Sequence, residues 1–266
     1  MNEEEILFEV DGKGIALMTL NRPEKLNAVT IQMSKGLFPK LFREIQENDN
    51  IRALIITGAG KGFCSGADVS TNLKAAITGE GGFKRRAKEE PVGGFTLAMA
   101  GIRKPVIAAV NGVAAGVGLS IALLSDIRIA SNNARFSAIF VRRGLMPDGG
   151  MTVTLPQIVG LPKALELAMT GEMIGAEEAL RIGLVNRVVP HEALMNEVKS
   201  LALKIASGPP LALSFIKRAL YRNVKVSFEE GLYFESWGQN VLLNTKDHIE
   251  GVNSFLEKRE PVFIGE

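Results

Sequence analysis

The sequence predicts an α/β fold in which mostly parallel strands precede a helical C-terminal region. In the first part of the chain, short apolar runs that end in glycine-containing turns alternate with helical stretches. Strands separated by helices favour parallel pairing, since a parallel pair needs a long crossover connection. The length of 266 residues suits one large domain, or one domain with a smaller appendage.

Local patterns predict the elements of the first part. The run D-G-K-G predicts a hairpin of Ile6–Val10 and Ile15–Leu20. Thr30 opens an amphipathic helix whose apolar side chains recur at helical spacing. Further strands are predicted at 53–57, Val106–Val110, 126–130 and Arg135–Ser137, and further helices at 95–102 and Val117–Leu124.

From Met151 onward every predicted element is helical. The helices span 152–159, 163–170, 176–182, 191–207, Pro210–Asn223, 228–243 and 246–258, with short turns of glycine or proline between them. We therefore divide the chain into a core of residues 1–190 and a helical C-terminal region of residues 191–266.

Composition and charge exclude several classes of protein. A net charge of +2 is too small to imply nucleic acid or an acidic membrane as a partner. Glutamates directly follow the basic run at 82–88, so this run is expected to be a solvated surface. The one cysteine, Cys64, excludes a disulfide framework and a cysteine metal site, and it favours a cytoplasmic setting. The acidic start M-N-E-E-E argues against a secretory signal.

One uncharged segment, residues 105–125, is long enough to span a bilayer. Asn111 and Gly112 interrupt it in the middle, however, between an apolar run that predicts a strand and one that predicts a helix. Two buried elements joined by a turn explain this segment better than a membrane span.

Two glycine-containing turns, residues 60–69 and 111–120, each follow a predicted buried strand directly. Small residues let a ligand approach the backbone closely. The second turn leads into a helix, whose first amides are unpaired and carry the positive end of the dipole. The two turns could form an oxyanion hole, or the glycines could merely allow tight packing; the pattern leaves both open.

Few other side chains are candidates for chemistry. Asp148 lies in a Pro-Asp-Gly-Gly run, which is a turn signal, and it could serve the turn alone or act as an acid/base. His191 and His248 fall in predicted helical segments and are expected at the surface. Cys64 is expected to be a small packing residue, and Asp68 to cap a loop or form a structural pair.

At these turns the chain resembles the crotonase superfamily, the enoyl-CoA hydratase/isomerase family, over nearly its whole length. The spaced motifs occur in the right order, which makes the resemblance specific. They are L-N-R-P-E-K-L-N-A-V, K-G-F-C-S-G-A-D-V, K-P-V-I-A-A-V-N-G-V-A-A-G-V-G-L-S, D-I-R-I-A, G-L-M-P-D-G-G, M-T-G-E-M-I-G-A-E-E-A-L-R-I-G-L-V-N-R-V-V and F-L-E-K-R.

The resemblance implies a spiral of β-β-α units whose helical C-terminal region mediates assembly, as a trimer or a dimer of trimers. It implies an acyl-CoA thioester as substrate, with coenzyme A as part of that substrate, no separate cofactor and no metal. The positions that match the family's oxyanion-hole donors are Ala67 and Val117. The residues expected to line the coenzyme A or acyl moiety are Lys25, Leu26, Ala28, Ser65, Gly66, Asp68, Val69, Gly116, Phe140, Phe255 and Lys258, the last two across a subunit contact.

The positions of the two glutamates of family hydratases hold Ser120 and Phe140 here. The two carboxylates that would hold a water molecule between them are therefore missing, and ordinary hydratase activity is not expected. Asp148 matches the single acid/base of enoyl-CoA isomerases, and the run F-V-R-R-G-L-M-P-D-G-G is similar to epoxyacyl-CoA isomerases of the phenylacetate pathway. We expect an apolar wall of Phe140, Leu145 and Met146 to raise the pKa of this carboxyl.

Other functions stay open on the same scaffold. Residual hydratase, hydrolase or aromatic acyl-CoA dehalogenase activity is one alternative. The other is a family member without catalysis that binds acyl-CoA, or RNA through Lys84, Arg85 and Arg86.

Overall fold

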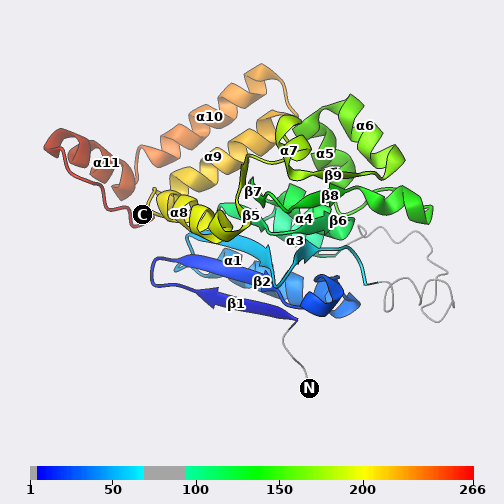
Figure 1. Ribbon diagram of the computed structural model, residues 1–266. Coiled ribbons are helices and arrows are strands. Elements are labelled where there is room, and N and C mark those ends of the chain that lie inside the picture. Colours follow the sequence, from blue (N-terminus) through cyan, green and yellow to red (C-terminus); the bar gives the residue numbers. More distant parts are fainter. Residues whose placement is uncertain (1–4, 69–93) are drawn as a thin grey trace.

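The computed structural model describes residues 5–68 and 94–266, and within them two β-sheets form the centre of the molecule (Figure 1). The larger sheet pairs β1 with β2 antiparallel, and all its other neighbours are parallel. Its order is β1 (Ile6–Val10), β2 (Ile15–Leu20), β3 (Ala53–Gly58), β5 (Val106–Val110), β7 (Ile127–Ser131) and β10 (Arg187–Val189). The smaller sheet runs β4 (Gly62–Cys64), β6 (Val113–Ala115), β8 (Arg135–Ser137) and β9 (Met173–Gly175), with β9 antiparallel.

The two sheets are built from one repeated unit. Each of β3, β5 and β7 is followed, after a short turn, by a strand of the smaller sheet: β4, β6 and β8. Both series are parallel within their sheets. Helix α3 (Phe95–Ala100) precedes β5, and helix α4 (Val117–Leu124) lies between β6 and β7. The expected α/β spiral of β-β-α units with C-terminal helices is confirmed.

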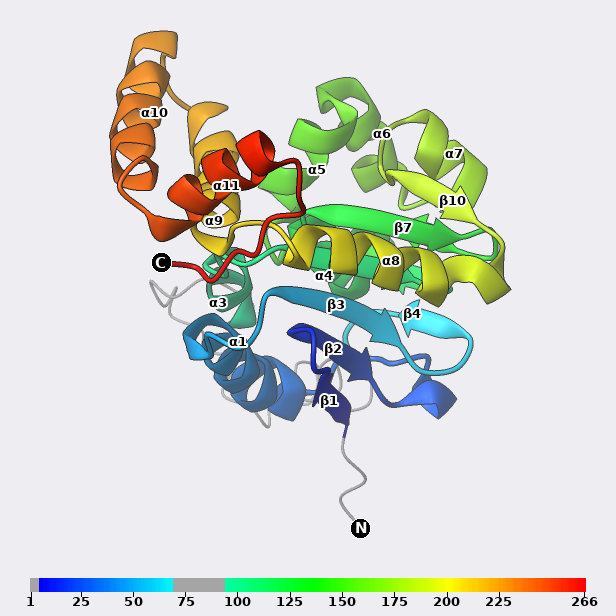
Figure 2. The ribbon, with the colours of Figure 1, turned by 90° about the vertical axis from the view of Figure 1, so that its left-hand side faces the viewer.

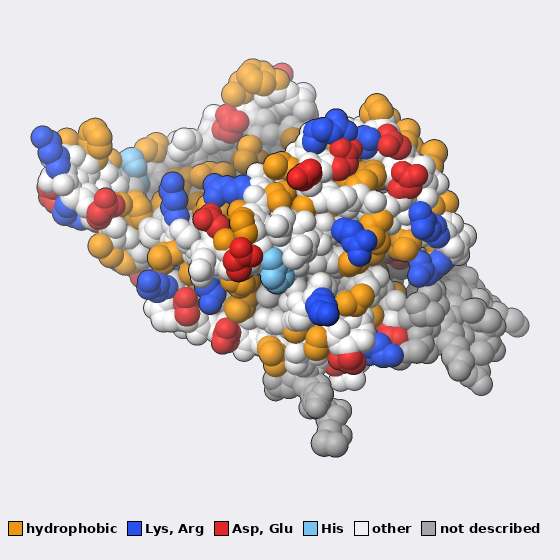
Figure 3. Space-filling view, viewed as in Figure 1, with side chains coloured by type: hydrophobic (Ala, Val, Ile, Leu, Met, Phe, Trp, Pro, Cys, Tyr) orange, Lys and Arg blue, Asp and Glu red, His pale blue; other side chains and the backbone are white. Residues whose placement is uncertain are grey.

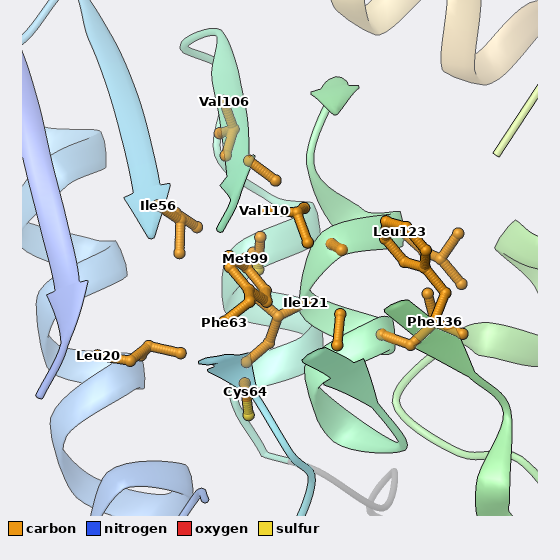
Figure 4. Packing of buried hydrophobic residues seen from close by; sticks show 14 of the residues in the cluster. Leu20, Ile56, Phe63, Cys64, Met99, Val106, Val110, Ile121, Leu123 and Phe136 are labelled. Carbon is orange, nitrogen blue, oxygen red and sulfur yellow. The ribbon is translucent and has the colours of Figure 1, made fainter. Parts of the chain in front are cut away.

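Alternation along the strands divides the apolar side chains between two cores. Leu20, Ile56 and Val110 point from the larger sheet toward Phe63 of β4 and Ile121 of α4 (Figure 4). Within each strand, the residues that alternate with these point to the opposite face of the sheet. On that face Ile15, Ile55, Ile107 and Ile129 pack under helix α8 (Leu194–Ala206), which crosses the sheet in Figure 2.

The remaining helices lie around the two sheets and form the C-terminal end. They are α1 (Phe38–Glu47), α5 (Met151–Val159), α6 (Leu161–Thr170), α7 (Ala176–Arg181), α9 (Pro210–Asn223), α10 (Phe228–Leu242) and α11 (Lys246–Glu257). Helices α9 to α11 project from one end of the sheets (Figures 1 and 2). No helix in the described part of the chain is both long and apolar enough to cross a bilayer.

The elements agree closely with the sequence prediction, apart from four strands of three residues each. The hairpin, β5, β8, α4 and α9 have the predicted bounds. Strands β4 and β6 lie inside segments that we predicted as turns, and β9 and β10 lie where only helices were expected. No local pattern indicated these four short strands, which form because they pair with neighbouring strands.

The first helix differs from the prediction in its geometry. The hydroxyl of Thr30 accepts a hydrogen bond from the Met33 amide at 3.0 Å, as expected for a residue that opens a helix. A π-helical turn, Met33–Leu37, then precedes α1, and the Phe38 amide bonds the Met33 carbonyl. Pro39 follows at once and has no amide hydrogen, so the regular ladder cannot form there.

The packing of α8 bears on the division at residue 190. Leu194, Val198, Ala202 and Ala206 are spaced four residues apart and all lie buried against the larger sheet. Residues 194–206 therefore pack with the core although they follow the predicted boundary. The division itself stays a prediction, and this packing favours a boundary near Gly208.

Two basic side chains connect the core with the C-terminal helices. Arg52, before β3, donates to the carbonyl oxygens of Ala206 (3.3 Å), Gly208 (3.3 Å) and Phe263 (3.0 Å). Lys217 of α9 pairs with Asp126, before β7, with Nζ 2.8 Å from Oδ2.

Tyr221, also in α9, lies near the same carboxylate. Burial is the main cause that raises the pKa of Tyr221 well above its ordinary value, and the Asp126 carboxylate raises it further.

The face shown in Figure 3 mixes basic and acidic side chains, in keeping with the net charge of +2. His191 and His248 are both exposed, as predicted. The ring nitrogen Nδ1 of His191 lies 3.1 Å from the Ser131 hydroxyl.

Replacing Arg52 with alanine removes the three hydrogen bonds that join the core to α8 and to the C-terminal tail. We expect the free energy of unfolding to fall by about 1–3 kcal/mol, because charged donors form stronger hydrogen bonds than neutral ones. Urea denaturation measures this change, and amide exchange should accelerate more in α9 to α11 than in β3 and β5. The control is Arg43→Ala at an exposed position of α1; an equal effect of both substitutions contradicts the linking role.

Cys64 should not react with thiol reagents while the protein is folded. The side chain is fully buried, and burial raises the pKa of its thiol to about 12. Thiolate, the reactive form, is therefore scarce at about pH 8. A colorimetric thiol assay should find no reactive thiol in native protein and one per chain in denaturant; rapid native labelling argues against the packing role.

Candidate active site

Two buried asparagine side chains hold the turn between β3 and β4. The Nδ2 group of Asn27 donates to the carbonyl oxygens of Ala59 (2.9 Å) and Gly62 (2.7 Å). The Nδ2 group of Asn111 donates to the same turn, at Gly58 (2.9 Å) and Gly60 (3.0 Å). The motif positions Asn27 and Asn111 thus hold the first glycine turn in place.

Glycines allow the second turn to approach the first at backbone distance. A Cβ atom at Gly112 would lie 2.0 Å from the Lys61 carbonyl oxygen, and one at Gly118 would lie 2.0 Å from the Cys64 carbonyl oxygen. Both distances are far below van der Waals contact, so only glycine fits at these positions. As a result β4 lies directly against the first turn of helix α4.

The two predicted oxyanion turns lie side by side. A Cβ atom at Gly116, which has a φ of +52°, would be 3.8 Å from the Gly66 Cα atom. Gly66 has a φ of +117°, and both glycines are buried. The residues that follow them, Ala67 and Val117, are half-buried.

The amides of Ala67 and Val117 are placed to serve an external acceptor. The bridge between Val29 and Ala67 uses the Gly66 carbonyl (2.8 Å) and the Asp68 amide (2.9 Å), so the Ala67 amide points away from it. Val117 is the first residue of α4, where amides have no partner within the helix. Among the described residues neither amide has a hydrogen-bond acceptor. Their role as oxyanion donors remains a prediction, to which this geometry is suited.

The turn that carries Asp148 packs on the same helix. The Ser120 hydroxyl of α4 donates to the Asp148 carbonyl oxygen at 3.0 Å. Gly149 and Gly150 have φ values of +61° and +82°, and Gly150 precedes the first residue of α5. The expected turn is therefore present, and it leaves Asp148 half-buried.

The three side chains predicted to form an apolar wall around Asp148 differ in burial. Phe140 is buried, and its Cζ atom is 3.9 Å from where a Cβ of Gly116 would lie. Leu145 and Met146, however, are 49% and 73% exposed. They line an apolar groove of about 340 Å³ against α5 and α6. An apolar wall of all three side chains around the carboxyl therefore stays a prediction.

Several residues expected to line coenzyme A lie together beside the first glycine turn. The Ser65 hydroxyl donates to the Lys25 carbonyl at 3.1 Å, and the Ser65 amide donates to the Leu26 carbonyl at 2.9 Å. Lys25 and Leu26 are exposed, and Ala28 is buried below them. Val69 lies outside the described residues, as does the basic run at 82–88.

Asp68 is committed to an ion pair. Its Oδ2 atom lies 2.8 Å from Arg22 Nη2, and the Asp68 side chain is buried. Arg22 also donates to the Ala28 carbonyl at 2.6 Å. This is the structural pairing that the sequence favoured over proton transfer, and it leaves little of the side chain to line a coenzyme A site. Arg22, part of the L-N-R-P motif, was not among the predicted site residues.

Phe255 and Lys258 do not join this group within one chain. Phe255 is 82% exposed on α11, and Lys258 ends that helix with a φ of +55°. In Figure 1, helix α11 projects at the left of the molecule, away from α4. Their contact with a ligand across a subunit boundary stays a prediction. No cluster of three or more His, Cys, Asp or Glu side chains able to hold a metal occurs in the described part.

Comparison with known proteins agrees with this architecture. Residues 11–266 match the family model Enoyl-CoA hydratase/isomerase. The chain is 37% identical over 262 residues to 1,2-epoxyphenylacetyl-CoA isomerase of Escherichia coli, covering 98% of this chain and 99% of that one. It is 39% identical to short-chain-enoyl-CoA hydratase of Clostridium acetobutylicum, covering 98% and 97%.

A solved structure shows the same fold. The crystal structure of enoyl-CoA hydratase from Bacillus anthracis superposes with a TM-score of 0.88 at 31% identity, covering 99% of this chain and 100% of that chain. The paired glycine turns, the spiral of β-β-α units and these similarities lead to one conclusion. The chain belongs to the enoyl-CoA hydratase/isomerase family and is an enzyme acting on acyl-CoA thioesters.

Proposed function

We propose that the protein is an enoyl-CoA isomerase that shifts a double bond from the 3-position to the 2-position with Asp148 as its single acid/base. The observation that carries the proposal is the packing of the Asp148 turn on helix α4, whose first residue, Val117, has an amide with no acceptor in the described part of the chain. Ser120 and Phe140, which are buried, stand where family hydratases hold glutamates. Asp68 is ion-paired with Arg22, so among the described residues we assign the acid/base role to Asp148.

The reaction needs one movable proton. Asp148 removes a proton from C2 of the 3-enoyl thioester, and the electron pair passes through the thioester carbonyl to give a dienolate. The amides of Ala67 and Val117 hold the resulting oxyanion. Asp148 returns the proton at C4, the double bond moves to the 2-position, and no atom is gained or lost.

Similarity to the hydratase of Clostridium acetobutylicum favours water addition as the second candidate. Similarity to the Escherichia coli epoxyphenylacetyl-CoA isomerase favours an isomerase, including isomerisation of a ring-bearing acyl group. We favour isomerisation because the Ser120 hydroxyl donates a hydrogen bond to a backbone carbonyl and the Phe140 side chain is apolar. Neither side chain offers a carboxylate to hold water. Hydrolase or dehalogenase activity, or acyl-CoA binding without turnover, would appear as outcomes of the same assays.

Assembly into a trimer or a dimer of trimers in the cytoplasm is part of the proposal. Large apolar side chains on α10 and α11 are exposed in the single chain, among them Phe228, Tyr233 and Phe255. Exposed apolar surface of this kind is typical of a protein interface. Coenzyme A enters as part of the substrate, and no further cofactor is proposed.

Replacing Asp148 with asparagine keeps the turn but removes the base. We expect 3-enoyl-CoA isomerisation to slow by about 10²–10⁴-fold, the usual contribution of one general base. The formation of the conjugated 2-enoyl thioester can be followed by its absorbance. Asp11→Asn is the matched control, because Asp11 is also a turn aspartate and accepts the Lys13 amide at 2.9 Å. Undiminished turnover of Asp148→Asn overturns the proposal.

Replacing Val117 with proline tests the amide donor itself. Val117 is the first helical residue, where proline is tolerated because its fixed φ suits the helix, and proline there lacks the N–H. We expect kcat to fall by about 10²–10³-fold. Val117→Ala keeps the amide and should retain kcat within about threefold. Equal rates for the two folded variants, checked by circular dichroism, argue against an oxyanion role for this amide.

A further inference from the structure

Ser120 connects the two parts of the proposed site. It lies in the first turn of α4, three residues after Val117, and it is fully buried. Its amide donates to the Gly116 carbonyl at 3.0 Å, within the second glycine turn. Its hydroxyl lies 3.0 Å from the Asp148 carbonyl oxygen and 3.4 Å from that of Gly116. One residue thus touches both the oxyanion turn and the acid/base turn.

The contact between Ser120 and the Asp148 turn is also steric. A Cβ atom at Gly149 would lie 2.9 Å from both the Cβ and the Oγ atoms of Ser120. Gly149 therefore packs against this side chain with no space between them. A longer side chain at position 120 would push the turn away from α4, and a shorter one would leave it without its hydrogen bond.

We infer that Ser120 is a positioning residue: it ties the Asp148 turn to helix α4 and so sets where the carboxylate stands relative to the Val117 amide. Because its hydroxyl donates to a backbone carbonyl and is buried, Ser120 does not itself move a proton of the substrate. The inference rests on the proposed role of Asp148 and goes beyond it, because it states what holds that carboxylate in place.

The turn has a backbone conformation that favours glycine. Three of its residues, Gly144, Gly149 and Gly150, have positive φ values. Of its ends, the Leu145 amide bonds the Phe140 carbonyl at 3.2 Å, and the Met151 amide bonds the Asp148 carbonyl at 3.1 Å. Both of these bonds are local in sequence. The Ser120 bond, by contrast, reaches across 28 residues to another helix.

The test compares two buried serines of the same helix region. Ser120→Ala removes the link to Asp148. Ser125→Ala is the matched control, because Ser125 is equally buried and donates to the carbonyl four residues before it, that of Ile121, at 3.1 Å. We expect Ser120→Ala to lower kcat for 3-enoyl-CoA isomerisation by about 10–100-fold, as misplacement of a reacting group by about an ångström does. KM should change by less than about threefold, and Ser125→Ala should keep wild-type kcat.

A double-mutant cycle separates positioning from general loss of structure. If Ser120 acts through Asp148, then Ser120→Ala should not slow the residual turnover of Asp148→Asn any further. The variant Ser120→Cys, with similar size and a weaker donor, should have intermediate kcat. A similar loss in both backgrounds, or unchanged kcat in Ser120→Ala, overturns the inference while leaving the role of Asp148 intact. Full activity of Asp148→Asn is a different result, which removes the proposed function itself.

Discussion

The contact on which the site depends is the one between Gly118 of helix α4 and the Cys64 carbonyl of β4. A Cβ atom at position 118 would lie 2.0 Å from that oxygen, so any other residue would force the helix and the strand apart. The same approach recurs at Gly112 and Lys61. Held at this distance, the turn after β4 and the start of α4 bring the Gly66–Ala67 and Gly116–Val117 peptides together. Because the positions of backbone amides follow the path of the chain, the glycines at this contact set the geometry of any oxygen bound there.

Helix α4 then serves as a common support. Its first residue offers an amide, its fourth holds the Asp148 turn, and its buried face packs into the core through Ile121 and Leu123 (Figure 4). Developing charge is stabilised best by dipoles that are already in place before reaction, and a buried helix between two sheets moves little. The side chains that hold the opposite turn, Asn27 and Asn111, are buried amides with no charge to desolvate. Uncharged hydrogen bonds and packing thus support the proposed oxyanion site.

The sequence predicted most of the fold and part of the site. Apolar alternation and helical spacing located β5, α4 and α9 to the residue, because those elements are long enough to show a period. The three-residue strands β4 and β6 could not be found in this way, although they are what brings the glycine turns together. The glycines and Asp148 were recognisable by residue type. The orientation of Leu145 and Met146 was not recognisable, because the local sequence does not indicate which side of a turn faces the groove at α5 and α6. The scaffolding roles of Asn27, Asn111 and Arg22 were hidden in quoted motifs for the same reason: their partners lie elsewhere in the chain.

The central claim is that this arrangement of one carboxylate and two amides moves a proton within an enoyl thioester and does not add water. Mass spectrometry of the products formed from 3-enoyl-CoA and from 2-enoyl-CoA tests it most directly. The account predicts that 3-enoyl-CoA gives 2-enoyl-CoA of unchanged mass, and that 2-enoyl-CoA gains no water at a comparable rate. Rapid formation of a product heavier by one water from 2-enoyl-CoA, with slow or no isomerisation of 3-enoyl-CoA, would contradict it.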